Sequence, residues 1–137
     1  MIRLLKTALA ATLLMAGGCM TVKEASDFKD VKDVKVDEGK TPASIVEIEN
    51  SVWLLLNFIP LGSGNPEAPN KNSCRWFRNT VSLENNMKAL HLKMDELGVR
   101  DVANLTSRYA DEKYLFFLLA RRACHTSAVL VRPATEN

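Results

Sequence analysis

The chain has 137 residues, of which 47% are hydrophobic and 25% are charged, and its formal net charge at pH 7 is +2. This length gives room for one small domain. The charge is nearly balanced, and there is neither a basic stripe nor a recognisable binding motif, which argues against a nucleic-acid-binding protein. The sequence also lacks a phosphate loop and a dinucleotide fingerprint, so it gives no indication of a nucleotide cofactor.

The first 18 residues have the features of a secretory signal. Arg3 and Lys6 form a positive start, an apolar run follows, and small residues precede Cys19. The apolar run is too short to span a bilayer. We therefore predict that residues 1–18 are removed. Without Arg3 and Lys6 the basic side chains equal the 16 acidic ones, so the mature chain is formally neutral.

The stretch Ala16-Gly17-Gly18-Cys19 resembles the lipobox of bacterial lipoproteins. The resemblance implies that Cys19 receives a diacylglyceryl group, becomes the first mature residue and holds the chain on a membrane. Ala16 stands where leucine is commonest in these motifs. Met20 follows in place of the aspartate that often retains such proteins in the inner membrane, which favours the outer membrane, facing the periplasm. The alternative is an ordinary secretory signal that is cleaved near Gly18 and leaves Cys19 as a thiol.

The segment after the signal is rich in Lys, Asp, Glu and Val, as in FKDVKDVKVDEGK, and has little to bury. We interpret residues 19–42 as a charged tether and residues 43–134 as a single domain. About 20 residues at roughly 3.3 to 3.6 Å each give the tether a maximum reach of about 70 Å. The alternative is that its valines begin a strand, although the spacing does not keep a period of two for long.

Two apolar segments precede the predicted helix. Residues 44–52 alternate, with Val46, Ile48 and Val52 on one side and glutamates on the other, which predicts a half-buried strand. The continuous run WLLLNFIPL at 53–61 fits either a strand buried on both faces or a membrane-contacting loop, and we expect the buried strand. The Gly, Pro and Asn residues over 62–73 predict a loop.

The clearest element is a helix over residues 83–97. Ser82 has the chemistry of an N-cap, and Gly98 suits a left-handed C-terminal stop. Apolar side chains recur at steps of four, three, four and three, which predicts one stripe facing a core. The methionines on this stripe are expected to be packing residues. The stripe consists of Leu83, Met87, Leu90, Met94 and Leu97.

The sequence after the helix is expected to complete a sheet. It predicts a strand over 99–107, a polar turn over 109–113, and one long or two short strands over 114–131. The run YLFFLLARR could instead be a buried helix, so residues 114–122 remain open between the two. The predicted fold class is α+β, with a small antiparallel or mixed sheet of three to four strands packed by the 83–97 helix in βαββ order.

Two further cysteines, Cys74 and Cys124, lie in a chain destined for a compartment that permits disulfides. An even pair predicts one bridge, and closing a loop of about 50 residues would add roughly 3 to 4 kcal/mol. The alternative is a redox or metal-responsive site that uses Cys74, Cys124 and His125. Those residues are one ligand short of a tetrahedral set, and adjacent strand residues point to opposite faces, so we expect no bound metal.

The segments SCRWFRN, MDELGVRDVANLTS and ACHTSAVLV together resemble the βαββ domain of small bacterial envelope lipoproteins, such as the outer-membrane sensors of the Rcs envelope-stress pathway. The likeness spans about residues 72–131. It implies a domain with one cysteine before its helix and another in a closing strand. The Rcs sensors have two bridges, whereas only one pair is available here, so the resemblance does not extend to a sensing role.

The sequence does not assemble a catalytic centre. None of its candidate serines lies in a nucleophile elbow, and only two histidines could act as a base. Glu47 and Glu49 share a strand face, which is ordinary for a solvated surface. We therefore predict a non-catalytic, membrane-anchored module that binds, senses or supports another envelope protein. The serines considered are Ser73, Ser82, Ser107 and Ser127.

Overall fold

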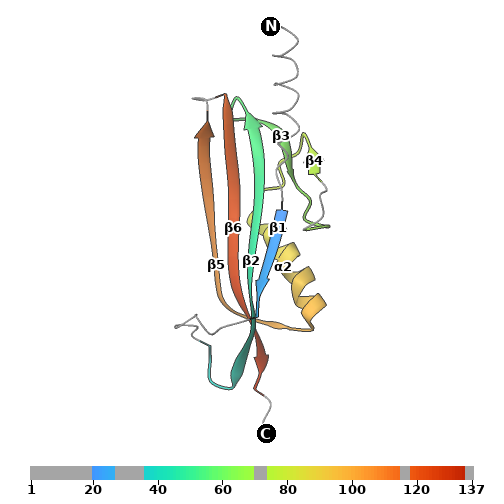
Figure 1. Cartoon of the computed structure of the whole chain (residues 1–137), viewed down its shortest axis with the longest axis vertical. Helices are drawn as coiled ribbons and strands as arrows, with labels where there is room; N and C mark the ends of the chain where they lie inside the picture. The colour runs from blue at the N-terminus through green and yellow to red at the C-terminus, as the bar shows by residue number, and fades with distance from the viewer. Residues whose placement is uncertain (1–19, 27–35, 70–73, 115–117, 135–137) are drawn as a thin grey trace.

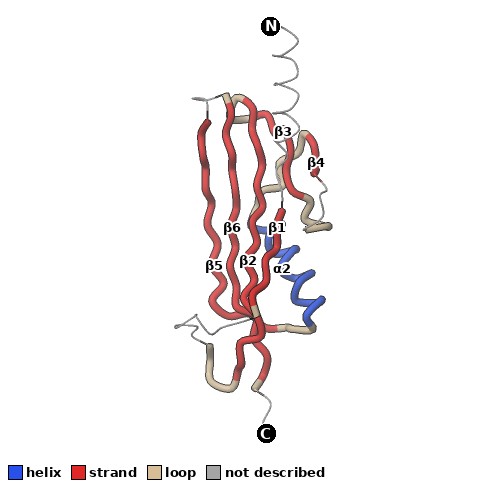
Figure 2. Tube along the Cα trace, viewed as in Figure 1, coloured by secondary structure: helices blue, strands red, loops and turns tan. Residues whose placement is uncertain are grey.

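The computed structural model describes residues 20–26, 36–69, 74–114 and 118–134. They form a six-stranded antiparallel sheet with the helix α2 (Leu83–Leu97) on one face (Figures 1 and 2). The strands are β1 (Met20–Ala25), β2 (Lys40–Leu55), β3 (Ile59–Gly64), β4 (Cys74–Trp76), β5 (Asp101–Tyr114) and β6 (Leu119–Pro133).

The long strands β2 and β6 form the spine of the sheet. They pair from Lys40 opposite Pro133 to Leu55 opposite Leu119, and the strand order is β4-β3-β2-β6-β5. The other edge of β2 is shared, because β1 pairs with residues 45–50 and β3 with residues 52–55. The strands β1 and β3 therefore follow one another along the same edge of β2.

The core lies between α2 and the lower half of the sheet in Figure 1. Alternate residues of β2 and β6 point toward the helix, and Leu90 and Ala89 meet them from α2. The predicted alternation over 44–52 is confirmed, because Val46, Ile48 and Val52 are buried on this face. Such a one-sided sheet needs apolar residues only at every second position.

The predicted helix is confirmed at both ends. The Ser82 hydroxyl accepts a hydrogen bond from the Asn85 backbone N–H at 3.1 Å, which satisfies one of the donors left open at a helix start. Gly98 adopts a left-handed conformation with φ 62° and ends the helix. Met87, Met94 and Leu97 pack on the core as expected, whereas Leu83 is exposed at the first turn.

The expected fold class is wrong. The sheet has six strands instead of three or four, four of them precede the helix, and strand is the dominant structure, so the βαββ layer is not formed. The expected turn over 109–113 is part of β5. The predicted strand over 99–107 falls largely within β5. As an edge strand, β5 is solvated on both faces for most of its length, so its second half carries too little alternation to be recognised as strand.

The segment expected to be a tether contributes to the sheet. Residues 20–25 form β1, residues 40–42 begin β2, and residues 27–35 lie outside the described part of the chain. Met20 and Val22 pack against the core, while the Lys93 ammonium of α2 lies 2.8 Å from the Glu24 carboxylate. Only two apolar side chains of β1 need burial, so the composition of this segment remains that of a solvated one.

The run WLLLNFIPL is a hairpin and not a strand buried on both faces. It forms the end of β2, a tight turn at Leu56 and Asn57, and the start of β3. Both turn residues have positive φ, 52° and 66°, and the Phe58 N–H donates to the Leu55 carbonyl at 3.2 Å. Such turns match the twist of paired strands. The expected burial fails here because the turn projects beyond the core.

Candidate functional site

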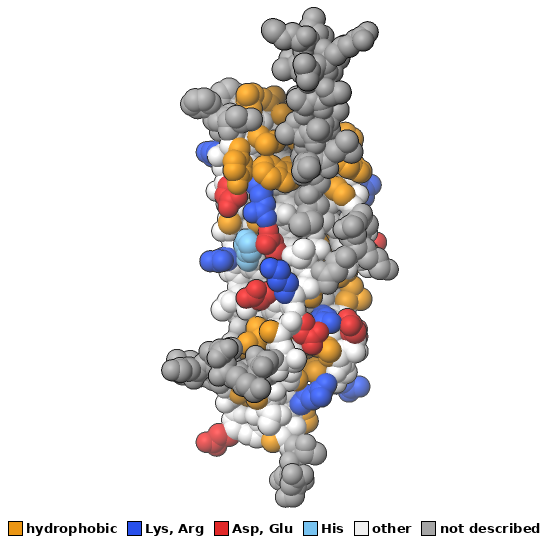
Figure 3. Space-filling model, viewed as in Figure 1, with side chains coloured by type: hydrophobic (Ala, Val, Ile, Leu, Met, Phe, Trp, Pro, Cys, Tyr) orange, Lys and Arg blue, Asp and Glu red, His pale blue; other side chains and the backbone are white. Residues whose placement is uncertain are grey.

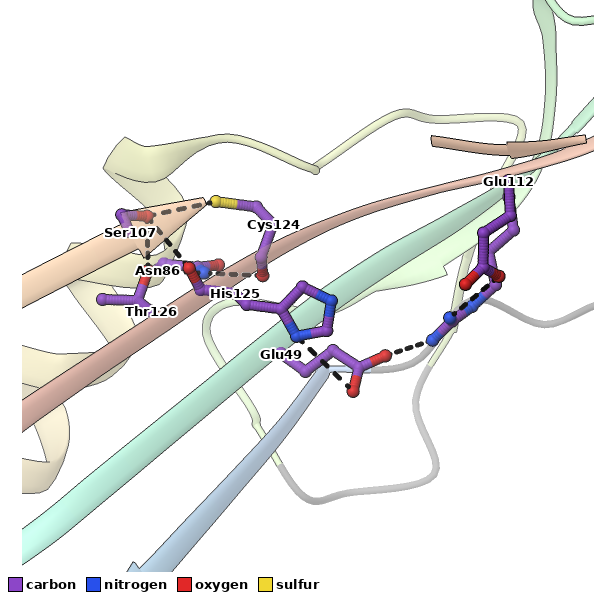
Figure 4. Close-up of polar contacts among 8 residues, drawn as sticks. Glu49, Asn86, Ser107, Glu112, Cys124, His125 and Thr126 are labelled. Carbon is purple, nitrogen blue, oxygen red and sulfur yellow. Dashed lines mark hydrogen bonds and ion pairs between the residues drawn. The ribbon is translucent and has the colours of Figure 1, made fainter. Parts of the chain in front are cut away.

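Two groups of polar side chains meet at β6, one on each face of the sheet. Successive residues of a strand point to opposite faces, so Cys124 and Thr126 face α2 while His125 faces the open side (Figure 4). Among the described elements, none covers the open face. The two groups are therefore a buried network under the helix and a solvent-facing network on the open sheet.

The buried network fixes α2 onto the sheet. The Asn86 amide, which is fully buried, donates to the Cys124 carbonyl and to the Thr126 hydroxyl, each at 2.9 Å. Ser107 on β5 donates to the His125 carbonyl at 3.1 Å, and its oxygen lies 3.0 Å from the Thr126 oxygen. The hydroxyls of Ser107 and Thr126 thus bond to the backbone and to the helix, which is a structural role.

The open-face network is centred on Glu49 of β2. Its carboxylate forms an ion pair with Arg121 and lies 3.9 Å from the His125 Nδ1 atom. Arg121 also lies 3.5 Å from Glu112 of β5, whose carboxylate accepts a 2.6 Å hydrogen bond from the Tyr114 hydroxyl. One chain of charged and polar groups thus crosses β2, β6 and β5.

The electrostatics of this network follow from its hydrogen bonds. Donation by the Tyr114 hydroxyl lowers the pKa of Glu112, and the nearby positive charge of Arg121 acts in the same direction. The same hydrogen bond raises the pKa of Tyr114, because ionisation would remove the donated proton. At neutral pH the Tyr114 hydroxyl is therefore protonated and donates to the ionised Glu112 carboxylate.

A shallow groove of about 330 Å³ lies beside this network on the open face. Its walls come from β1, β2, β5 and β6, and Figure 3 shows charged side chains crossing this side of the molecule. Both signs of charge are present, so the groove suits a polar surface better than an apolar ligand. The polar residues that line it include Thr21, Lys23, Glu47, Glu49, Thr106, Arg108, His125 and Ser127.

The structure does not join the two predicted disulfide partners. Cys74 lies in β4 and Cys124 in β6, with β3 and β2 between them. Three strand spacings are about 14 Å in a flat sheet, beyond the roughly 7 Å limit between the Cα atoms of a bridge. The bridge was predicted from the number of cysteines. Whether two cysteines can be joined depends on the order of the strands that carry them, and the number of cysteines does not reveal that order.

The alternative redox or metal site is not assembled either. The Cys124 thiol is buried toward α2, 3.7 Å from the Ser107 hydroxyl, whereas the His125 ring is on the open face (Figure 4). Within the described ranges, no group of three or more His, Cys, Asp or Glu side chains is placed to hold a metal ion. Of the other predicted residues, Cys19 and Ser73 lie outside those ranges.

Sequence reasoning missed a cluster of exposed apolar side chains at the end of the sheet. The cluster is carried by the β2–β3 turn, the start of β6 and the residue after β4, and Figure 3 shows hydrophobic side chains gathered at this end. The Leu56 N–H donates to the Leu118 carbonyl at 2.8 Å, which ties the two turns together. We call this cluster the apolar tip: Leu55, Leu56, Phe58, Ile59, Phe77 and Leu118.

A signal for the tip was present in the sequence. The continuous run at 53–61 admits a membrane-contacting loop as well as a core strand, and the polar Asn57 at its centre marks the turn.

No helix in the described part of the chain is long and apolar enough to cross a bilayer. Comparison with family models, curated proteins and solved structures finds no match to the chain.

Proposed function

We propose that the chain is a lipoprotein of the bacterial cell envelope, anchored through an acylated Cys19 at the outer membrane and facing the periplasm, and that it acts as a non-catalytic binding module. The proposal begins with the N-terminal sequence, where a basic start, an apolar run and Ala-Gly-Gly precede Cys19. Two or more acyl chains on one residue give stable membrane attachment, whereas one chain does not.

The observation that carries the proposal is the position of Met20. It directly follows Cys19, is only 3% exposed, and packs with Val46 and Leu90 in the core. Consecutive Cα atoms are about 3.8 Å apart, so an acylated Cys19 would be joined to the sheet without a spacer. A strand that begins at the second mature residue suits a domain that is held directly on its membrane.

The open-face groove is the surface that we assign to partner recognition. It carries Lys23 and Arg108 beside Glu47 and Glu49, so a complementary polar surface can pair with both signs of charge. Anchoring raises the effective concentration of partners that share the membrane, so a modest interface suffices. The Ser107 hydroxyl donates to the His125 backbone carbonyl and not to its ring, which is consistent with a non-catalytic role.

Intact mass spectrometry of the chain extracted from native membranes tests the proposal. We expect the mass of residues 19–137 plus a diacylglyceryl group, with or without a further acyl chain. A Cys19→Ala variant should lose the lipid mass and keep residues 1–18. An unacylated mature chain that begins at Cys19, or lipid mass that persists in the variant, would contradict the proposal.

A further inference from the structure

We propose that the apolar tip inserts into the bilayer that carries the acyl chains, so that the chain binds lipid through its protein surface as well as through its anchor. This inference rests on the proposed function, because the anchor selects the membrane. It adds a second point of attachment, which fixes how the sheet is oriented on the membrane.

The position of β1 places the tip near the anchor. Met20 pairs with Asn50, which lies five residues before Leu55, the end of β2 at the tip. At about 3.4 Å per residue the tip is about 17 Å from the level of Met20, whereas the opposite end of β2, at Lys40, is about 34 Å away. The end of the sheet that is nearer to Met20 is therefore the apolar one.

The exposure of the tip is unusual for a soluble surface. Phe58 and Phe77 are 71% and 73% exposed, and further exposed leucines and an isoleucine lie at the same end of the sheet. Contiguous apolar patches of this kind on a soluble domain mark interaction sites. Burying such side chains in an apolar phase is favourable, so a few of them together give appreciable attachment.

The residues just below the tip are those that occur at membrane interfaces. Trp76 and Tyr114 are exposed, and the ring of Trp53 lies 5.3 Å from that of Tyr114. Trp and Tyr are enriched at the level of lipid headgroups, because each has an apolar ring and a polar edge. The Tyr114 hydroxyl points to Glu112 and away from the apolar cluster, which keeps its polar end on the solvated side.

The charge around the tip complements an anionic lipid surface. The strand ends and turns that carry the tip, residues 51–64, 74–79, 109–114 and 118–123, hold five basic side chains. Three of these, Arg75, Arg121 and Arg122, form ion pairs with carboxylates. Arg78 and Lys113 are both exposed. Basic side chains close to an anionic lipid surface are attracted to it. Arg78 and Lys113 thus add exposed positive charge beside the apolar tip.

The turn at the tip carries an apolar residue at a conformational cost. Leu56 has φ 52°, in the left-handed region, which is unfavourable for residues other than glycine, Asn and Asp. Turns with positive φ at both central residues usually have Asn-Gly there, whereas this chain has Leu56-Asn57. A leucine at this unfavourable position supports a role for its side chain outside the folded domain. Contact with a bilayer would be such a role.

Tryptophan fluorescence in vesicles tests the insertion, because both tryptophans of the chain, Trp53 and Trp76, lie next to the tip. The acylated full chain is reconstituted in vesicles of phosphatidylethanolamine and phosphatidylglycerol, with and without bromine atoms on the acyl chains. We expect brominated lipid to quench the emission, the emission maximum to shift to shorter wavelengths, and iodide in the buffer to quench poorly.

Matched variants assign the signal to the tip. Phe58→Ser should lose most of the quenching by brominated lipid, while Leu92→Ser, which removes a 47% exposed leucine from α2, should leave it unchanged. Thermal unfolding followed by circular dichroism checks that both variants fold. Equal quenching in the wild type and in both variants would overturn the assignment.

The outcomes separate this inference from the proposed function. An acylated chain that floats with vesicles but is quenched only by iodide would overturn tip insertion and leave the anchored lipoprotein standing. A chain with neither acyl mass nor flotation would overturn the proposed function. If the tryptophans are shielded from iodide in the absence of lipid and the chain sediments as a dimer, the tip is covered by a second copy of the chain. That result would overturn insertion.

Discussion

At the scale of single residues, Asn86 makes the most specific contact between the helix and the sheet. Its amide is fully buried and donates twice, to the Cys124 carbonyl and the Thr126 hydroxyl. We expect Asn86→Ala to lower the free energy of unfolding by about 1 to 3 kcal/mol, because two acceptors lose their partner in a buried place. Urea unfolding measures this. Lys88→Ala on the exposed side of α2 is the control, and an equal effect in both would contradict the assignment.

The strain at Leu56 gives a prediction of the opposite sign. Leu56→Asn should raise the free energy of unfolding by about 1 kcal/mol, because Asn tolerates the left-handed conformation that Leu56 adopts. The same substitution should weaken membrane insertion by removing a leucine from the tip. If Leu56→Asn lowered both the free energy of unfolding and membrane insertion, Leu56 would be needed for the fold and not for contact with the bilayer.

The Glu112 and Tyr114 pair predicts a pH dependence. The pKa of Tyr114 is raised above its ordinary 10.0, so its contribution to stability is complete below pH 10 and is lost as the pH rises through the raised pKa. The pKa of Glu112 is lowered below 4.5, so its contribution is complete above pH 4.5 and is lost as the pH falls through the lowered pKa. The hydrogen bond therefore stabilises the fold throughout the neutral range.

An ultraviolet titration checks this assignment. In a Tyr109→Phe background Tyr114 is the only tyrosine, and Glu112→Gln should bring its pKa back toward 10.0. Asp111→Asn changes the neighbouring carboxylate, which pairs with Arg122 on the other face, and should leave the titration of Tyr114 in place. A Tyr114 pKa that does not respond to Glu112→Gln would refute the hydrogen bond as its cause.

At the scale of elements, the sequence predicted what local chemistry determines. The helix over 83–97 was predicted with its cap and its stop, and the strand over 44–52 with its two faces, because capping and periodicity are local. A strand was expected over 99–107, but its continuation to Tyr114 and the whole of β1 escaped prediction, because both depend on pairing with β6 and β2. The hairpin was mistaken for core because its turn has one usual turn residue, Asn57, with leucine and phenylalanine on either side.

The separation of the cysteines is also a property of the elements. With β3 and β2 between Cys74 and Cys124, we expect no bridge, so a reducing agent should leave the urea midpoint unchanged. A bridge that closes this loop would make the reduced protein less stable by about 3 to 4 kcal/mol. Intact mass before and after reduction is the companion measurement, and a gain of two hydrogens would contradict the strand order.

At the scale of the whole molecule, the long axis of the sheet separates two surfaces with different chemistry. The apolar tip lies at the end nearer to Met20, and the charged groove lies on the open face further along the sheet (Figure 3). A domain held at the tip would present the groove sideways above the membrane. The proposed insertion at the tip and the proposed partner binding at the groove would therefore use different residues and would not exclude each other.

The whole-molecule geometry also replaces the expected tether. A flexible segment of about 20 residues would let the domain stand up to about 70 Å from the bilayer. Met20 is instead buried in the core, so an anchor at Cys19 leaves no spacer, and residues 27–35 connect β1 to β2 within the chain. We expect the domain to sit against the membrane.

Neutron reflectometry of the acylated chain on a supported bilayer tests this claim most directly, because it measures protein density along the membrane normal. The account predicts protein density that begins within the headgroup layer and continues outward without a gap. A water layer between the bilayer and the protein would contradict it, and would show a domain that is anchored on a tether with its tip free.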